Sequence, residues 1–194
     1  GKAIAKLFSL EGAKVIIASR NQENLVNAVN DIRQSGNEII DYYKTDVTNT
    51  EDVANLFSFV FNKHGSIDVL VNNSGVMDGN PIDQVSDEQW ESVISVNVTG
   101  TFKCTREGFK YMKSRGGKII NIGSIAGDSP RMFSSPYTTS KHAVRGLTKS
   151  AALDGREYGI SVSCLNPGNT MVERRSDGRS GTGRDEGQEI LIDA

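Results

Sequence analysis

The sequence predicts an α/β fold, in which helices cover both faces of a parallel sheet. Short apolar runs, such as residues 14–18 (KVIIA) and 67–72 (IDVLVN), are typical of strands buried on both sides. Segments with apolar residues at helical spacing alternate with these runs along the chain. The connections are long enough for crossovers, which parallel strands require.

Each expected element has a local reason. Gly12 can end the first helix, and Asn49 or Thr50 can cap the third. Pro167 and Gly168 follow the last clear strand. Helical spacing of apolar residues predicts helices over 1–10, 22–35, 49–64, 86–114 and 135–157. Short apolar runs predict strands over 14–18, 39–44, 67–72, 118–122 and 160–165.

Length and composition fit one domain over residues 1–194, with a net charge of −2. The basic residues are scattered, so we expect neither a nucleic-acid partner nor a membrane partner. No apolar run is long enough for a membrane span and no secretory signal is visible, so a cytoplasmic location is expected. Residues 173–188 are rich in glycine and charge, which predicts a mobile loop. The two cysteines, Cys104 and Cys164, lack metal-ligand spacing, so we expect buried, reduced thiols and no metal site.

Polar or special residues stand directly after the predicted strands. Because a parallel sheet of this kind binds ligands beyond the carboxyl ends of its strands, these residues predict a binding crevice there. The residues in these positions are Arg20, Asp46, Asn73, Ser124 and Gly168.

Tyr137 and Lys141 are four residues apart, so both side chains lie on one face of a helix. An ammonium beside a phenol favours the phenolate, which suits a general acid/base. Ser124 follows a strand and can donate a hydrogen bond to a carbonyl oxygen on which charge develops. Asn97 is a poor residue for a helix interior, which points to a polar role. The alternatives are a packed tyrosine, a serine that caps a turn and an asparagine that satisfies local backbone.

Together these residues resemble the short-chain dehydrogenase/reductase family. The matching motifs are Asn72-Asn73-Ser74-Gly75, Asn97, Ser124, Tyr137-x-x-x-Lys141 and Pro167-Gly168. The resemblance runs from Gly1 to about Glu173, and it implies a Rossmann-like doubly wound sheet.

The resemblance implies a catalytic tetrad of Asn97, Ser124, Tyr137 and Lys141. Tyr137 would exchange the proton with the carbonyl or alcohol oxygen, and Ser124 would polarise that oxygen. Lys141 would favour the phenolate and bind the nicotinamide ribose. Asn97 would hold a water molecule that links Lys141 to solvent.

The expected cofactor is NADP(H) in preference to NAD(H). Where NAD-preferring members carry an acidic residue, this chain has Ser19 followed by Arg20. A guanidinium with a hydroxyl can bind a 2′-phosphate, which a carboxylate would repel. Thr170 stands two residues before the position where the family's threonine reaches the cofactor. The further contacts that the resemblance implies are Gly1 at the phosphates, Asp46 and Val47 at the adenine, Asn73 and Gly75 at the adenosine ribose, Tyr137 and Lys141 at the nicotinamide ribose, and Pro167, Gly168 and Thr170 by the nicotinamide.

The family's first strand and glycine-rich phosphate motif precede the residue that matches Gly1, and its final helices and strand follow residue 192. That first strand would lie between those formed by residues 14–18 and 67–72. We therefore interpret the sequence as a fragment and expect residues 1–194 alone to bind NADPH weakly and to be marginally stable.

The resemblance implies an oxidoreductase that transfers a hydride between NADP(H) and a ketone or secondary alcohol. It is compatible with a 3-oxoacyl reductase or a general ketone reductase, and steroid or sugar substrates stay open. Alternatives are a non-catalytic dinucleotide-binding redox sensor, an inactive fragment and a sugar-nucleotide epimerase or dehydratase. A homodimer or homotetramer, formed through the helices matching 98–114 and 135–157, is expected from the resemblance alone.

Overall fold

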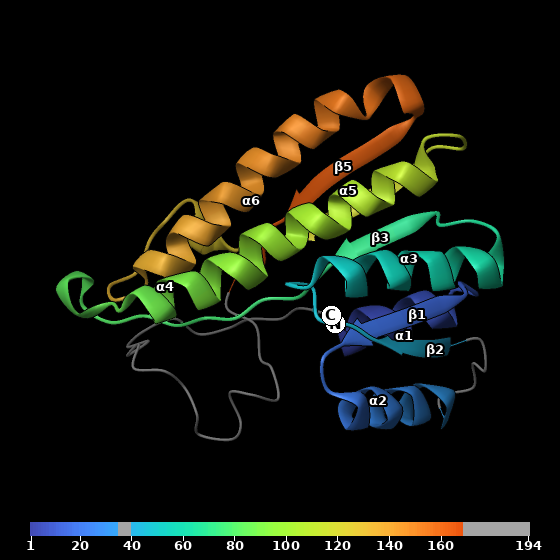
Figure 1. Ribbon diagram of the computed structural model, residues 1–194, viewed down its shortest axis with the longest axis horizontal. Helices are drawn as coiled ribbons and strands as arrows, with labels where there is room; N and C mark the ends of the chain where they lie inside the picture. The colour runs from blue at the N-terminus through green and yellow to red at the C-terminus, as the bar shows by residue number, and fades with distance from the viewer. Residues whose placement is uncertain (35–39, 169–194) are drawn as a thin grey trace.

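Strands and helices alternate along the chain as the sequence predicts (Figure 1). The computed structural model describes residues 1–34 and 40–168. The strands are β1 (Val15–Ser19), β2 (Ile40–Lys44), β3 (Val69–Asn72), β4 (Gly117–Ile122) and β5 (Ile160–Leu165). The helices are α1 (Lys2–Leu10), α2 (Gln22–Gln34), α3 (Thr50–His64), α4 (Asp87–Ile94), α5 (Thr101–Met112) and α6 (Ser135–Asp154).

The predicted elements exist, but some of their boundaries differ. The strand expected from residue 67 begins at Val69. The single helix expected over 86–114 is divided by a π-helical segment, Ser95–Gly100, between α4 and α5. The helix expected over 135–157 ends at Asp154, and a short 3-10 turn, Arg156–Tyr158, follows it. The cap predicted for the third helix is confirmed, since the Asn49 side chain accepts hydrogen bonds from two backbone amides at the start of α3.

All pairings between the described strands are parallel, which confirms the predicted α/β class. They form two sheets, one of β1 and β2 and one in the order β3–β4–β5. Within residues 1–34 and 40–168, β1 therefore makes no ladder with β3. The strand that the family resemblance places between them stays a prediction.

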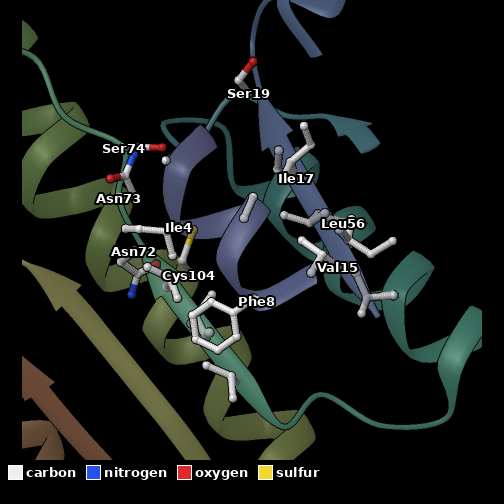
Figure 2. A pocket seen from close by; sticks show the side chains of 18 of the residues that line it. Ile4, Phe8, Val15, Ile17, Ser19, Leu56, Asn72, Asn73, Ser74 and Cys104 are labelled. Carbon is white, nitrogen blue, oxygen red and sulfur yellow. The ribbon is translucent and has the colours of Figure 1, made fainter. Parts of the chain in front are cut away.

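A cavity of about 660 Å³ lies between these two sheets. Its walls are largely apolar, with Phe8 of α1, Ile17 of β1 and Leu56 of α3 among the lining residues (Figure 2). Figure 2 shows polar side chains, those of Ser19, Asn73 and Ser74, gathered at one end of this cavity. That end is where β1 and β3 finish, so the polar groups border an apolar space at the carboxyl ends of the strands.

Separate groups of buried side chains hold the two sheets. Helices α1 and α2 pack with β1 and β2 in a cluster that contains Ala5, Val29 and Ile40. Helices α3 and α5 pack beside β3 through Val53, Phe57 and Cys104. Burial of these side chains, at roughly 25 cal/mol per Å² of apolar surface, stabilises each layer in its own right.

The two cysteines differ in burial. Cys104 is buried, and this burial raises the pKa of its thiol to about 12, as expected of an inert core thiol. Cys164 is only half-buried, so the prediction of a buried thiol is wrong there. The reason is its place on β5, which is an edge strand among the described residues.

Within residues 1–34 and 40–168, no helix is both long and apolar enough to cross a membrane.

A buried polar network fixes the ends of β3 and β4. The Asn72 amide donates to Asn121 Oδ1 at 2.8 Å and to Thr105 Oγ1 at 3.1 Å. The Asn121 amide donates to Thr148 Oγ1 at 2.9 Å. Because Thr105 is on α5 and Thr148 on α6, these bonds tie two strands to two helices at one level.

Replacement of Asn121 by Ala should therefore destabilise the fold, because it leaves buried polar partners unsatisfied. We expect the free energy of unfolding to fall by about 2–3 kcal/mol, measured by urea denaturation. The control is Asn30→Ala on α2, where the side chain is exposed and the change should be within about 0.5 kcal/mol. Equal effects of the two substitutions would show that the network does not contribute.

Candidate active site

Asn97, Lys141 and Tyr137, three of the four residues predicted for the catalytic tetrad, lie near the carboxyl ends of β3 and β4. A Cβ atom added to Gly75, just after β3, would lie 3.5 Å from Asn97 Oδ1 and 3.8 Å from Lys141 Nζ. Lys141 Nζ in turn lies 5.5 Å from the centroid of the Tyr137 ring. Asn97 and Lys141 thus adjoin the segment that the family resemblance assigns to the cofactor, and Tyr137 lies on the other side of Lys141.

Lys141 is held between the helix that carries it and the end of β4. Only 6% of its surface is exposed, and its ammonium donates to the Ile122 carbonyl oxygen at 2.9 Å. Burial lowers the pKa of Lys141, and the nearby Cys164 opposes this shift. The result is an amine that is fixed in place one helical turn from Tyr137 and that loses its proton more readily than an exposed lysine.

Tyr137 and Ser124 are both half-buried and lie on segments that pack against each other. Tyr137 is in the first turn of α6, which starts with Ser135 and Pro136. Ser124 precedes a 3-10 turn, Ile125–Gly127, that packs on α6 so closely that a Cβ on Gly127 would lie 3.2 Å from the Lys141 carbonyl oxygen. Both residues therefore lie at the corner of the fold where this turn packs on α6.

Ser124 caps the turn that follows it, which was one alternative from the sequence. Its Oγ accepts a hydrogen bond from the Ala126 backbone amide at 3.1 Å. Capping uses a lone pair of the oxygen and leaves the hydroxyl proton able to donate. The adjacent Ile125 amide donates to the Pro167 carbonyl at 3.2 Å, which brings Ser124 beside the Pro167-Gly168 segment after β5.

Asn97 uses its side chain to bind the loop after β3. It is 1% exposed, and its Oδ1 accepts the Val76 amide at 2.8 Å. Its Nδ2 donates to the Val76 carbonyl at 2.9 Å and to Ser140 Oγ at 3.0 Å. The Asn97 side chain thus has a polar role, which is to hold the loop after β3 in place. The sequence did not identify its partners, Val76 and Ser140. The signal available for Ser140 was a serine inside a helix, where serine is unfavourable.

Four of the residues predicted for the adenosine half of the cofactor lie at or just after the ends of β1 and β2, namely Ser19, Arg20, Asp46 and Val47, whereas Asn73 and Gly75 follow β3. Asp46 accepts hydrogen bonds from the Thr48 amide and hydroxyl. Burial of Asp46 favours its neutral form, but these bonds and the charges of Arg20 and Lys103 lower its pKa overall. Arg20 is exposed and close enough to act on this carboxylate. Positive charge therefore stands at the end of β1, where a phosphate could be bound.

Two glycines allow close approach of backbone in this region. A Cβ on Gly1, at the start of α1, would lie 2.8 Å from Asn73 Nδ2. A Cβ on Gly100 would lie 2.7 Å from Val47 Cγ2, so Val47 rests directly on the end of the π-helical segment. A helix N-terminus beside a glycine, with basic and polar groups at the adjoining strand ends, fits a dinucleotide.

The remaining predicted residues lie at the edge of the described chain. Pro167 is half-buried and Gly168 exposed, directly after β5. Thr170 and the loop predicted over 173–188 lie outside the described residues. Within residues 1–34 and 40–168, no group of His, Cys, Asp and Glu is arranged to hold a metal ion.

Comparison with known proteins points to one family. The family profile described as short chain dehydrogenase matches residues 1–182. A 3beta-hydroxysteroid dehydrogenase of Mediterraneibacter gnavus is 36% identical over 180 residues, which are 91% of this chain and 65% of that protein. A putative ketoacyl reductase of Streptomyces coelicolor is 35% identical over 171 residues, 87% of this chain and 65% of that protein. The chain thus spans slightly less than two thirds of the length of these relatives.

Solved structures agree. An actinorhodin polyketide ketoreductase with NADPH superimposes with a TM-score of 0.88 at 32% identity, covering 92% of this chain and 69% of that one. A gluconate 5-dehydrogenase from Burkholderia cenocepacia, in complex with NADP and tartrate, has a TM-score of 0.84 at 31% identity, covering 93% of this chain and 72% of that one. With this Rossmann-like fold and these sequence matches, the chain belongs to the short chain dehydrogenase family of oxidoreductases.

Proposed function

We propose that the whole protein is an NADP(H)-dependent oxidoreductase that interconverts a ketone and a secondary alcohol. The observation that supports this most is the position of Lys141, which lies beside Asn97 and Gly75 at the end of β3 and 5.5 Å from the centre of the Tyr137 ring. When bound, the nicotinamide supplies or accepts the hydride, which leaves the protein to provide orientation and proton transfer.

Tyr137 is the proposed general acid and base. Its hydroxyl gives a proton to the carbonyl oxygen during reduction and removes one from the alcohol during oxidation. Ser124 donates a hydrogen bond to the same oxygen as negative charge develops. Lys141, one turn away on α6, favours the phenolate by its charge and binds the nicotinamide ribose.

The Asn97 side chain is already bonded to Val76 and Ser140. A water molecule held by Asn97, as the family resemblance implies, stays a prediction. The contribution of Asn97 that the geometry supports is to hold the loop after β3 beside Lys141.

The preference for NADP(H) rests on Arg20. Its guanidinium is exposed at the end of β1, and the preceding residue is Ser19, which carries no charge to repel a phosphate. The two solved relatives described above contain NADPH or NADP, which agrees with this choice.

The substrate that we favour is an apolar ketone or the corresponding alcohol, such as a steroid or a 3-oxoacyl compound. The loops after β3 and β4 expose Met77 and Met132, with 61% and 80% of their surfaces accessible. These loops pack on each other, since a Cβ on Gly79 would overlap the Phe133 carbonyl. Relatives named as a hydroxysteroid dehydrogenase and a ketoacyl reductase act in the same chemical range.

We further expect a cytoplasmic homodimer or homotetramer. Phe102 on α5 and Leu153 on α6 leave 45% and 58% of their surfaces accessible, and both lie on the helices predicted to form the subunit contact.

Replacement of Tyr137 by Phe should remove the proton donor and keep the ring. We expect turnover of NADPH with a ketone to fall by about 10²–10⁴-fold, while the affinity for NADPH changes little. Stopped-flow or steady-state absorbance of NADPH on the full-length protein, over a panel of ketones, measures this. Tyr158→Phe, beyond the far end of α6, is the matched control. Undiminished turnover in the Tyr137 variant would refute the assigned mechanism.

Replacement of Arg20 by Asp should reverse the cofactor preference, because a carboxylate repels the 2′-phosphate and can bind a ribose 2′-hydroxyl. We expect the ratio of kcat/KM for NADPH to that for NADH to fall by about tenfold or more. Arg115→Asp, on the turn before β4, should leave the ratio unchanged. An unchanged ratio in the Arg20 variant would remove the basis for the NADP(H) assignment.

Lys141 should make stability depend on pH. Its folded-state pKa is below the ordinary 10.5, so the unfolded chain binds more protons between these two values. Stability from this group therefore rises with pH across that window. Lys141→Met should flatten the rise in the free energy of unfolding as the pH approaches 10.5 from below, measured by urea titration at successive pH values. Lys149→Met, an exposed lysine on the same helix, should keep the wild-type slope.

A further inference from the structure

We propose that Ser140 is a positioning residue that couples, through Asn97, the loop after β3 to the helical turn carrying Tyr137 and Lys141. This inference rests on the proposed function and adds a residue to its machinery. Ser140 does not face the reacting atoms in this scheme; it acts by fixing the groups that do.

The Ser140 hydroxyl makes two bonds in a fully enclosed place. None of its surface is exposed, and its Oγ donates to the Tyr137 carbonyl at 2.7 Å. The same oxygen accepts the Asn97 amide at 3.0 Å. A hydroxyl has one proton and two lone pairs, so both bonds exist together.

The other bonds of Asn97 fix the direction of its amide. Oδ1 faces the Val76 N–H and Nδ2 faces the Val76 carbonyl, each within 2.9 Å. A flipped amide would place donor against donor and acceptor against acceptor at Val76. The Ser140 oxygen therefore receives the second proton of an amide whose orientation is already determined by the loop.

These contacts form a closed circuit around the site. Val76 follows Gly75, and a Cβ on Gly75 would lie 3.8 Å from Lys141 Nζ. Lys141 follows Ser140 in the chain, and Ser140 is bonded through Asn97 back to Val76. Movement of the loop after β3 is thus resisted by the turn of α6 that holds the proton-transfer residues.

A simpler account is that the Ser140 hydroxyl only satisfies its own hydrogen-bonding capacity, by donating to the Tyr137 carbonyl in the preceding turn of the same helix. In that case Ser140→Ala is neutral or stabilising, because alanine is the better helix former. On the proposed account the same substitution removes an acceptor from the buried Asn97 amide and loosens both ends of the circuit. The two accounts therefore predict opposite results for one variant.

The test uses the full-length protein with Ser140→Ala, Ser140→Cys and, as the matched control, Ser150→Ala at an exposed site on the same helix. NADPH-dependent ketone reduction is measured across pH, and exchange of the Val76 amide is followed by NMR. We expect Ser140→Ala to lower kcat by about tenfold, to move the pH profile and to speed Val76 exchange, since small losses of alignment slow proton transfer. Ser140→Cys, with a weaker donor and acceptor of similar size, should recover part of each effect.

Coupling is tested by repeating Ser140→Ala in an Asn97→Ala background, where it should change kcat by less than about twofold. Wild-type kcat, pH profile and Val76 exchange in Ser140→Ala would overturn the proposal, as would additive losses in the double variant. If Ser140→Ala does not fold, the Ser140→Cys variant decides by the same readouts. If the wild type turns over no ketone, the proposed function fails, and Val76 exchange still decides whether Ser140 holds the loop.

Discussion

The hydrogen bond between the buried side chains of Asn72 and Asn121 is the contact on which the site depends most. It joins the last residue of β3 to the residue before the end of β4. Asn73 follows the first of these, and Ile122, whose carbonyl holds Lys141, follows the second. With Thr105 and Thr148 as further partners, the network fixes the positions of β3, β4, α5 and α6 relative to one another. Asn73 and Ile122, which directly follow the bonded asparagines, keep their spacing because the ends of β3 and β4 are fixed.

The sequence predicted well what local pattern controls. Buried strands such as 118–122 contain consecutive apolar residues because both of their faces are covered, and Tyr137 and Lys141 share a face because four residues make about one helical turn. It did not predict the partners of Asn97, since Val76 and Ser140 lie 21 and 43 residues away and meet it only through tertiary packing. The π-helical segment was likewise hidden, because its residues are compatible with an ordinary α-helix.

The residues proposed for proton transfer and those proposed for substrate recognition lie on different parts of the chain. Ser124, Tyr137 and Lys141 lie on or beside regular elements that pack closely, which suits groups whose alignment determines rate. The exposed Met77 and Met132 lie on loops, where replacement has little consequence for the core. This proposed division is compatible with relatives that carry names as different as hydroxysteroid dehydrogenase and gluconate 5-dehydrogenase.

The division of the described strands into two sheets has a consequence for cooperativity. The unit of β1, β2, α1 and α2 has its own buried cluster, and no backbone ladder between the described strands joins it to the unit that carries Tyr137 and Lys141. Arg20 lies between β1 and α2 of the first unit, and the proposed proton-transfer residues Tyr137 and Lys141 lie on α6 of the second. A strand between β1 and β3, as the family resemblance implies, would pair with both and join the two units into one sheet. A dinucleotide with contacts on both units would add its binding energy only to the state in which both are folded and docked, and so would raise their joint stability.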